Sequence, residues 1–96
     1  MTLVEHDGKT YELKMTRAGV RAAEAAGLTT GELTEKPQSS IALLFFAALY
    51  SRYKMNPNKA AAMLDDLLDS GEVEFSEMFE SLADQYTELF GSGESE

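Results

Sequence analysis

The first fourteen residues alternate between apolar and polar side chains, and a tight-turn signal interrupts the alternation. Around the dipeptide Asp7-Gly8, Leu3 and Glu5 alternate with Val4 and His6, and Thr10 and Glu12 alternate with Tyr11 and Leu13. Because glycine adopts positive φ without steric cost, Asp-Gly between two alternating segments is a strong hairpin signal. The pattern predicts a β-hairpin over residues 2–14. Since an isolated hairpin is marginal in water, we expect it to lie against the helices that follow.

The rest of the chain has the three-to-four-residue apolar spacing of helices. This spacing predicts helices over residues 16–27, 40–55, 57–70 and 76–90. The predicted N-caps are Thr16, Ser39 or Ser40, Asn56 and Ser76, and the predicted stops are Gly27, Gly71 and Gly91. Residues 28–40 are a predicted loop with one possible helical turn near residues 31–34, and residues 91–96 a flexible acidic tail. The predicted fold class is α+β, mostly α: a hairpin and about four helices in one domain over residues 1–90.

The predicted helix over residues 40–55 is apolar on every side. Its residues 41–50 read IALLFFAALY, without a charged side chain. Such a helix is either central and surrounded by the rest of the fold or partly covered by another chain. The predicted helix over residues 76–90 adds a second apolar stripe with acidic residues on its far side. Two wide apolar surfaces are hard to bury in so small a domain, and an exposed remainder would mark a contact site.

The candidate partner-binding residues are the large apolar side chains of these two helices, for which core and interface both stay open. They are Phe45, Phe46, Leu49, Tyr50 and Tyr53, followed by Phe79, Tyr86 and Phe90. The stripe of Met63, Leu64, Leu67 and Leu68 on the preceding helix is interpreted as core.

The net charge of −9 lies almost entirely in the second half of the chain. Residues 1–54 carry seven Lys and Arg against six Asp and Glu, whereas residues 55–96 carry one Lys against eleven Asp and Glu. Nucleic acid and anionic membranes require the opposite sign, so neither is a predicted partner. The acidic half is either a solvated surface or faces a basic partner.

Composition and the N-terminal segment place the chain in a broad class. There is no cysteine, which fits a reducing compartment and removes disulfides and thiolate chemistry. The first fifteen residues lack the apolar core of a secretory signal, and the longest apolar run has about half the length needed to span a bilayer. We therefore expect a soluble, cytoplasmic protein.

No combination of residues in the sequence indicates an enzyme. His6, the one histidine, sits beside the hairpin turn and is interpreted as an exposed turn residue. The carboxylates of the last third fall on polar helix faces, where water keeps them ionised. A calcium-loop template laid on Asp66 places Leu68 where an oxygen ligand is required, and the helix is expected to run through that segment. We predict no catalytic residue, cofactor or metal.

The order of these features resembles the tail assembly chaperones of long-tailed bacteriophages and prophages. The resemblance spans residues 8–90 and is carried by GKTYEL in the hairpin, the small-residue helix ending AAG and the helix ALLFFAALYSRYK, followed by NPNKAAAMLDDLL. It implies a non-enzymatic protein of the bacterial host cytoplasm that binds and solubilises the apolar, helical tape-measure protein. It also implies contact with tail-tube protein through a frameshifted extension, and self-association in some members.

Two other classes compete with this interpretation. A small acidic adaptor or inhibitor would cover a basic surface through the carboxylates of Glu77, Glu80, Asp84 and Glu88, and its binding would depend strongly on salt. A hydrolase would need a nucleophile and a base, and no such pair is apparent in the sequence.

Overall fold

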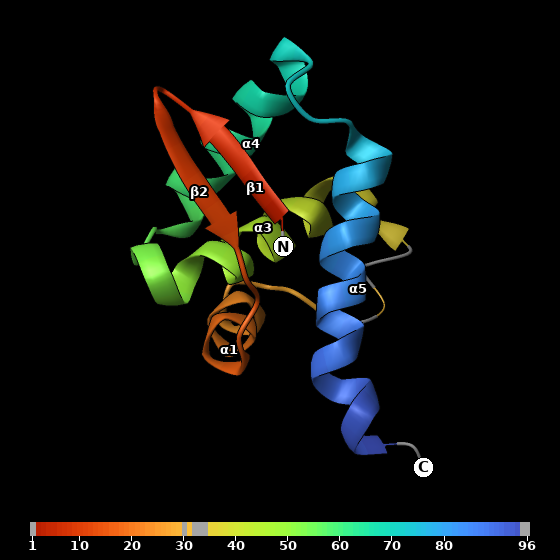
Figure 1. Cartoon of the computed structure of the whole chain (residues 1–96). Coiled ribbons are helices and arrows are strands. Elements are labelled where there is room, and N and C mark those ends of the chain that lie inside the picture. Colours follow the sequence, from red (N-terminus) through yellow and green to blue (C-terminus); the bar gives the residue numbers. More distant parts are fainter. Residues whose placement is uncertain (1, 30, 32–34, 95–96) are drawn as a thin grey trace.

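A computed structural model describes residues 2–29, 31 and 35–94 of the chain, and within these ranges it describes side chains from Leu3 to Leu89. The protein is α+β and mostly α, as predicted, with an N-terminal antiparallel hairpin followed by helices in one small domain (Figure 1). The elements are β1 (Thr2–His6), β2 (Lys9–Leu13), α1 (Arg17–Ala25), α3 (Pro37–Tyr53), α4 (Pro57–Ser70) and α5 (Phe75–Glu94).

A two-residue turn and a regular antiparallel ladder form the hairpin. Asp7, with φ of 54°, and Gly8, with φ of 77°, both have the positive φ that a type I′ turn requires. The register continues from this turn to Thr2, which lies opposite Leu13. The predicted hairpin is therefore confirmed.

Strand β2 lies on the C-terminal half of α3. The backbone N–H of Glu12 donates to the Tyr53 hydroxyl at 3.0 Å, and the N–H of Lys14 donates to the Ala48 carbonyl oxygen at 3.1 Å. Arg52 adds an ion pair to the Glu12 carboxylate at 2.7 Å. The expectation that the hairpin lies against the helices is confirmed, because these contacts join its second strand to α3.

Helix α1 approaches α3 closely through small residues. Thr16 caps the helix as predicted, because its hydroxyl oxygen accepts a hydrogen bond from the Gly19 N–H at 3.0 Å. A β-carbon built on Gly19 would collide with the carbonyl oxygen of Ala47 in α3. Glycine therefore sets how closely the two backbones approach.

Helix α3 begins earlier than predicted. Its first residue is Pro37, so Ser39 and Ser40 lie within its first turn instead of capping it. Proline is favoured at the first helical position because its φ is already helical and its missing N–H has no helical acceptor there. The predicted loop is shorter accordingly, and the possible turn near residues 31–34 lies mainly outside the described residues. At the other end, Lys54 adopts φ of 53° and ends the helix after Tyr53.

Helix α3 is the centre of the fold. It packs against α1, α4, α5 and β2, so of the two alternatives for an all-apolar helix the structure has the surrounded one. Its buried apolar side chains form the middle of the hydrophobic core: Ile41, Leu44, Phe45, Phe46, Ala47, Ala48 and Leu49.

Helix α4 has the predicted bounds. The Asn56 side-chain oxygen accepts from the Lys59 N–H at 2.7 Å, Pro57 is the first helical residue, and Gly71 ends the helix with φ of 82°. Because α4 runs to Ser70, the first part of the segment to which the calcium template applied is helical, but the helix does not run through the whole segment, since Gly71 ends it.

Helix α5 differs from the prediction at both ends. It begins at Phe75, so Ser76 is a helical residue and not a cap, and its backbone continues through Gly91 to Glu94. Glycine costs about 1 kcal/mol in a helix interior but does not exclude helical φ and ψ, so Gly91 is not a stop here. The predicted helix end at residue 90 is therefore wrong, because residues 91–94 of the predicted tail are helical, and residues 95 and 96 lie outside the described residues.

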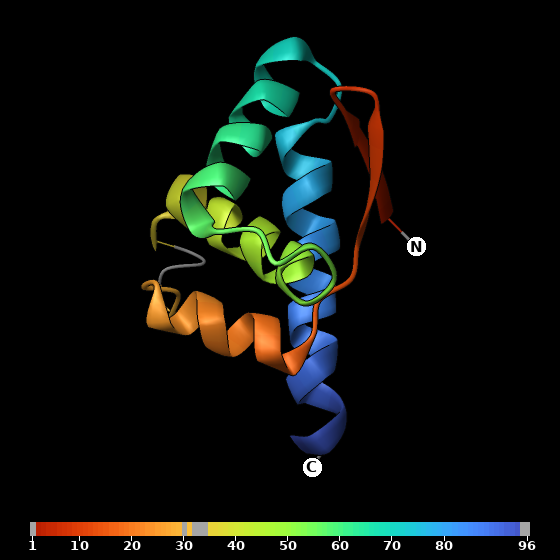
Figure 2. The same ribbon diagram turned by 90° about the vertical axis from the view of Figure 1, so that its left-hand side faces the viewer.

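The side-chain amide of Gln85 joins α5 to the end of the hairpin. Its oxygen accepts from the Met15 N–H at 2.7 Å, and its nitrogen donates to the Leu13 carbonyl oxygen at 3.1 Å. Figures 1 and 2 show α5 running the length of the molecule, with α1 towards one end and the α4–α5 connection at the other. The candidate protein-binding surface lies at that connection.

Candidate protein-binding surface

The candidate contact residues on α3 are mostly core residues. Phe45 and Leu49 have no exposed surface and Phe46 is 3% exposed, so their prediction as partner contacts is wrong for the folded chain. The physical reason is that α3 has neighbours on all sides, which removes the apolar surplus expected from its sequence. An apolar surface for a partner must therefore come from other elements.

Tyr50 and Tyr53 are half-buried and already have internal contacts. The Tyr50 ring packs edge-on against Phe46 with centroids 5.6 Å apart, and the Tyr53 ring packs edge-on against Tyr11 at 5.0 Å. The Tyr53 hydroxyl also accepts the β2 hydrogen bond described above. Tyr53 therefore joins α3 to β2, whereas the contact between Tyr50 and Phe46 lies within α3 itself.

The candidate residues on α5 also include both buried and half-buried side chains. Tyr86 is buried at 9% exposure, so its prediction as a partner contact is also wrong for the folded chain. Phe79 is half-buried and keeps part of its ring accessible. Phe90 belongs to α5, but its side chain lies outside the described residues. Of the eight candidates, Phe79 remains as the best-placed apolar contact.

Phe79 belongs to an apolar strip at the α4–α5 end of the molecule. Its ring stacks on that of Phe75, with centroids 5.9 Å apart and planes 15° from parallel. Leu68 and Val73 are half-buried beside this pair and pack against the same core. An open groove of about 500 Å³ adjoins the pair, and we call it the α4–α5 groove; it is lined by Gln38, Asp65, Leu68, Asp69, Gly71, Val73, Glu74 and Phe75.

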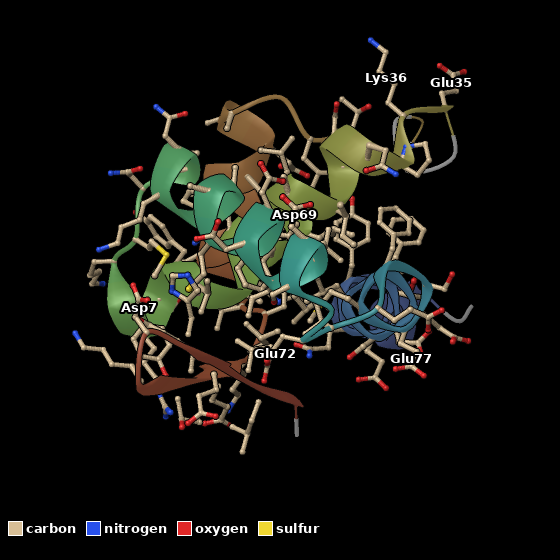
Figure 3. The ribbon with its side chains drawn as sticks, turned by 90° about the horizontal axis from the view of Figure 1, so that it is seen from above. Asp7, Glu35, Lys36, Asp69, Glu72 and Glu77 are labelled. Atoms are coloured by element: carbon tan, nitrogen blue, oxygen red, sulfur yellow. The ribbon has the colours of Figure 1, made fainter. Side chains whose placement is uncertain are left out.

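Carboxylates surround this apolar strip. Asp65, Asp69 and Glu74 line the α4–α5 groove and are all exposed. Figure 3 shows Asp69 on α4, Glu72 on the connection near the hairpin and Glu77 on α5, all at the same end of the molecule. A partly exposed apolar strip with an acidic border suits a partner segment that is both apolar and basic.

Leu3 was not among the candidates, although it is the one large apolar side chain classed as exposed in the described part of the chain, at 55%. The signal was present in the alternation of the first strand, where Leu3 and Glu5 share the face opposite Val4. Attention to which face of the hairpin meets the helices would have identified it.

His6 does not lie free beside the turn, as the sequence suggested. Its Nε2 lies 3.2 Å from the Asp66 carboxylate of α4, and its side chain is 22% exposed. The pair connects the turn end of the hairpin to α4. Within residues 2–29, 31 and 35–94, no group of three or more His, Cys, Asp or Glu side chains is arranged to hold a metal ion.

These features define a small α+β domain, a hairpin packed on a central apolar helix, with an acidic surface at the α4–α5 end. None of its described helices is both long enough and apolar enough to cross a membrane. The chain belongs to the family described as domain of unknown function DUF5055, whose sequence profile matches residues 1–96. No curated protein and no solved structure matches the chain.

Proposed function

We propose that this protein is a non-enzymatic assembly chaperone of the phage-tail type, which binds and solubilises a long, apolar tape-measure protein in the bacterial cytoplasm. The comparison with this family rests on the sequence resemblance over residues 8–90. The proposed contact surface is the α4–α5 groove and the adjoining Phe75–Phe79 pair. The buried face of α3 plays no part in it.

The observation that carries the proposal is the half-buried Phe75–Phe79 stack beside a groove bordered by carboxylates. Aromatic rings supply a large contact area with few rotatable bonds, which suits reversible binding of an apolar helix. The surplus negative charge, −9 over the chain, makes loaded complexes repel one another and so opposes their aggregation. Together these features provide both adhesion and solubility.

Co-expression with the candidate client tests the proposal. The probe is the protein encoded by the very long reading frame that we expect beside this gene. We expect it to be largely soluble with the wild-type chain and largely insoluble with the Phe79→Asp variant. Leu89→Asp is the matched control, because Leu89 is also a half-buried apolar residue of α5 but, unlike Phe79, does not stack on Phe75, which lines the groove.

Thermal melts followed by circular dichroism establish that each variant is folded. If Phe79→Asp unfolds the chain, Val73→Asp in the α4–α5 connection takes its place, because Val73 lines the groove from outside the helices. Equal client solubility with the groove variants and with wild type contradicts the proposed surface. Absence of a long neighbouring reading frame with helical apolar repeats contradicts the chaperone function itself.

A specific observation supports a second function, a small acidic adaptor or inhibitor. Glu77, Glu80, Asp84 and Glu88 are all exposed and follow one another at helical spacing along α5. Such a line of charge suits a basic protein surface. If the adaptor function is correct, neutralising all four weakens binding strongly and wild-type binding falls steeply with salt, whereas Phe79→Asp has little effect.

A further inference from the structure

The outer edge of β1 presents unpaired backbone groups. In a two-residue hairpin the residues flanking the turn form the first hydrogen-bonded pair, here His6 and Lys9, and bonded and non-bonded pairs then alternate. Leu3 and Glu5 fall on the non-bonded positions, so their N–H and C=O groups point away from β2. In the described part of the chain, neither residue has a hydrogen-bond partner on that side.

A groove runs along this edge, between β1 and the beginning of α5. Leu3 and Val73 line both of its adjoining hollows, of about 330 and about 300 Å³, and Met78 lines the larger one. Figure 1 shows β1 lying between β2 and α5, so the open edge faces this groove. We call it the β1 groove. Its apolar lining and the free backbone groups lie side by side.

The border of the β1 groove is acidic. Glu5, Glu72, Glu74 and Glu77 are exposed and line it, and the described residues that line it include no lysine or arginine. Figure 3 shows Glu72 between the hairpin and α4, and Glu77 on the α5 side. A segment entering this groove therefore meets negative charge on both sides of an apolar lining.

We propose that β1 accepts an extended segment of another protein as a third strand, and that this segment alternates apolar and basic residues. Main-chain hydrogen bonds to Leu3 and Glu5 would give affinity, as in other cases of strand addition to an open sheet edge. Apolar side chains would cover Leu3 and Val73, and basic ones would reach the carboxylates. This surface shares Gly71, Val73 and Glu74 with the α4–α5 groove but does not include the Phe75–Phe79 pair, and the proposal does not depend on the tape-measure function.

A second copy of the chain does not fit this edge. Pairing of β1 with β1 would bring the acidic border of one molecule against the same border of another. With a net charge of −9 on each chain, that arrangement is electrostatically unfavourable. A basic segment would instead be attracted to the acidic border of the groove. This charge complementarity is the reason for preferring a basic segment to a second copy of the chain.

Amide hydrogen exchange with a defined peptide tests the proposal on the wild-type chain. The probe is a seven-residue peptide that alternates valine and lysine, and the control peptide alternates valine and glutamate. At a concentration about ten times Kd, we expect the valine–lysine peptide to slow exchange of the Leu3 and Glu5 amides about tenfold. The valine–glutamate peptide should leave both exchange rates unchanged.

Two substitutions at one position separate backbone pairing from charge. Glu5→Pro removes the outward N–H at a place where an edge strand tolerates proline, whereas Glu5→Gln removes the charge and keeps the N–H. We expect Glu5→Pro to bind the valine–lysine peptide about fivefold more weakly than Glu5→Gln, which corresponds to one lost hydrogen bond. Slow exchange of the Val4 and Tyr11 amides shows that the hairpin ladder is intact in both.

Three results overturn the proposal. The first is that the valine–lysine peptide leaves the Leu3 and Glu5 amides unprotected in wild type, whether it binds elsewhere or not at all. The second is equal affinity of Glu5→Pro and Glu5→Gln with an intact ladder. The third is a wild-type dimer in sedimentation that Glu5→Pro abolishes, because the occupant would then be a second copy. If Glu5→Pro disrupts the ladder, the wild-type exchange measurement decides alone.

Discussion

The two edges of the hairpin have different surroundings, although both strands come from the same short segment. On the β2 edge, the outward N–H groups of Glu12 and Lys14 donate to Tyr53 and Ala48 of α3. On the β1 edge, the outward N–H groups of Leu3, opposite Glu12, and of Glu5, opposite Thr10, have no partner in the described part of the chain, and the outward N–H of Thr10 on β2 has none there either. The position of α3, and not strand composition, therefore decides that the Glu12 N–H has an acceptor while the N–H of its cross-strand partner Leu3 does not.

Two sets of aromatic residues also differ in their surroundings. Phe45 and Phe46 are buried in α3, which packs against four other elements, whereas Phe75 lines the α4–α5 groove, Phe79 stacks on Phe75, and both stay half-buried. The molecule therefore has a closed side around α3 and an open side formed by β1, the α4–α5 connection and the start of α5. Stability should depend on the closed side and binding on the open side.

The largest expected effect is a loss of stability on truncating a closed-side ring. Phe45→Ala should lower the free energy of unfolding by about 3–5 kcal/mol, because a fully buried ring is removed and the cavity fills only partly. Phe75→Ala on the open side should cost about 1 kcal/mol, since water already reaches part of that ring. Urea denaturation followed by circular dichroism measures both. Equal losses would break the distinction between the two sides.

A smaller loss is expected where α1 meets α3. Gly19→Ala places a β-carbon against the Ala47 carbonyl oxygen, and a backbone atom cannot move aside as a flexible side chain does. The two helices must separate, so we expect a net loss of about 1–3 kcal/mol despite the higher helix propensity of alanine. Gly31→Ala is the control, because its β-carbon would meet no atom within 4 Å. A stabilised Gly19→Ala variant would contradict this packing.

The smallest effect concerns the two hairpin edges themselves. Tyr53→Phe removes the hydroxyl that accepts from the Glu12 N–H, and we expect a loss of about 0.5–1.5 kcal/mol. Exchange of the Glu12 amide should accelerate, while the Leu3 and Glu5 amides should exchange rapidly in both wild type and variant. Amide exchange resolved by nuclear magnetic resonance measures this. Slow exchange at Leu3 or Glu5 in the wild-type chain alone would show that the β1 edge is not open.

Elements with strong local signals were predictable from the sequence. The bounds of α4 follow from the Asn56 cap, Pro57 at the first helical position and Gly71 at the end, and these signals act within a few residues. The start of α3 was mispredicted because two serines resemble caps, although Pro37 precedes them. The end of α5 was mispredicted because Gly91 suggested a stop and the helix runs past it.

The contact surface was only partly predictable for a different reason. The sequence identifies large apolar side chains, but Phe45, Leu49 and Tyr86 are buried by elements that are distant along the chain. Phe79 stays half-buried, although its neighbours Met78 and Leu82 in α5 are buried. His6 was interpreted as exposed, yet Asp66 of α4 lies beside it, sixty residues further along the chain.

The sequence by itself determined the hairpin, the helices, the N-cap of α1, both ends of α4 and the concentration of acid in the second half of the chain. Each of these depends on residues that are close neighbours along the chain, through apolar period, caps, turn chemistry and charge. Only the tertiary structure decided that α3 is enclosed, that α3 supplies acceptors for the Glu12 and Lys14 N–H groups, and that the β1 edge and the α4–α5 groove stay open. Burial is a property of which distant segments meet, and alternation or helical period does not specify that.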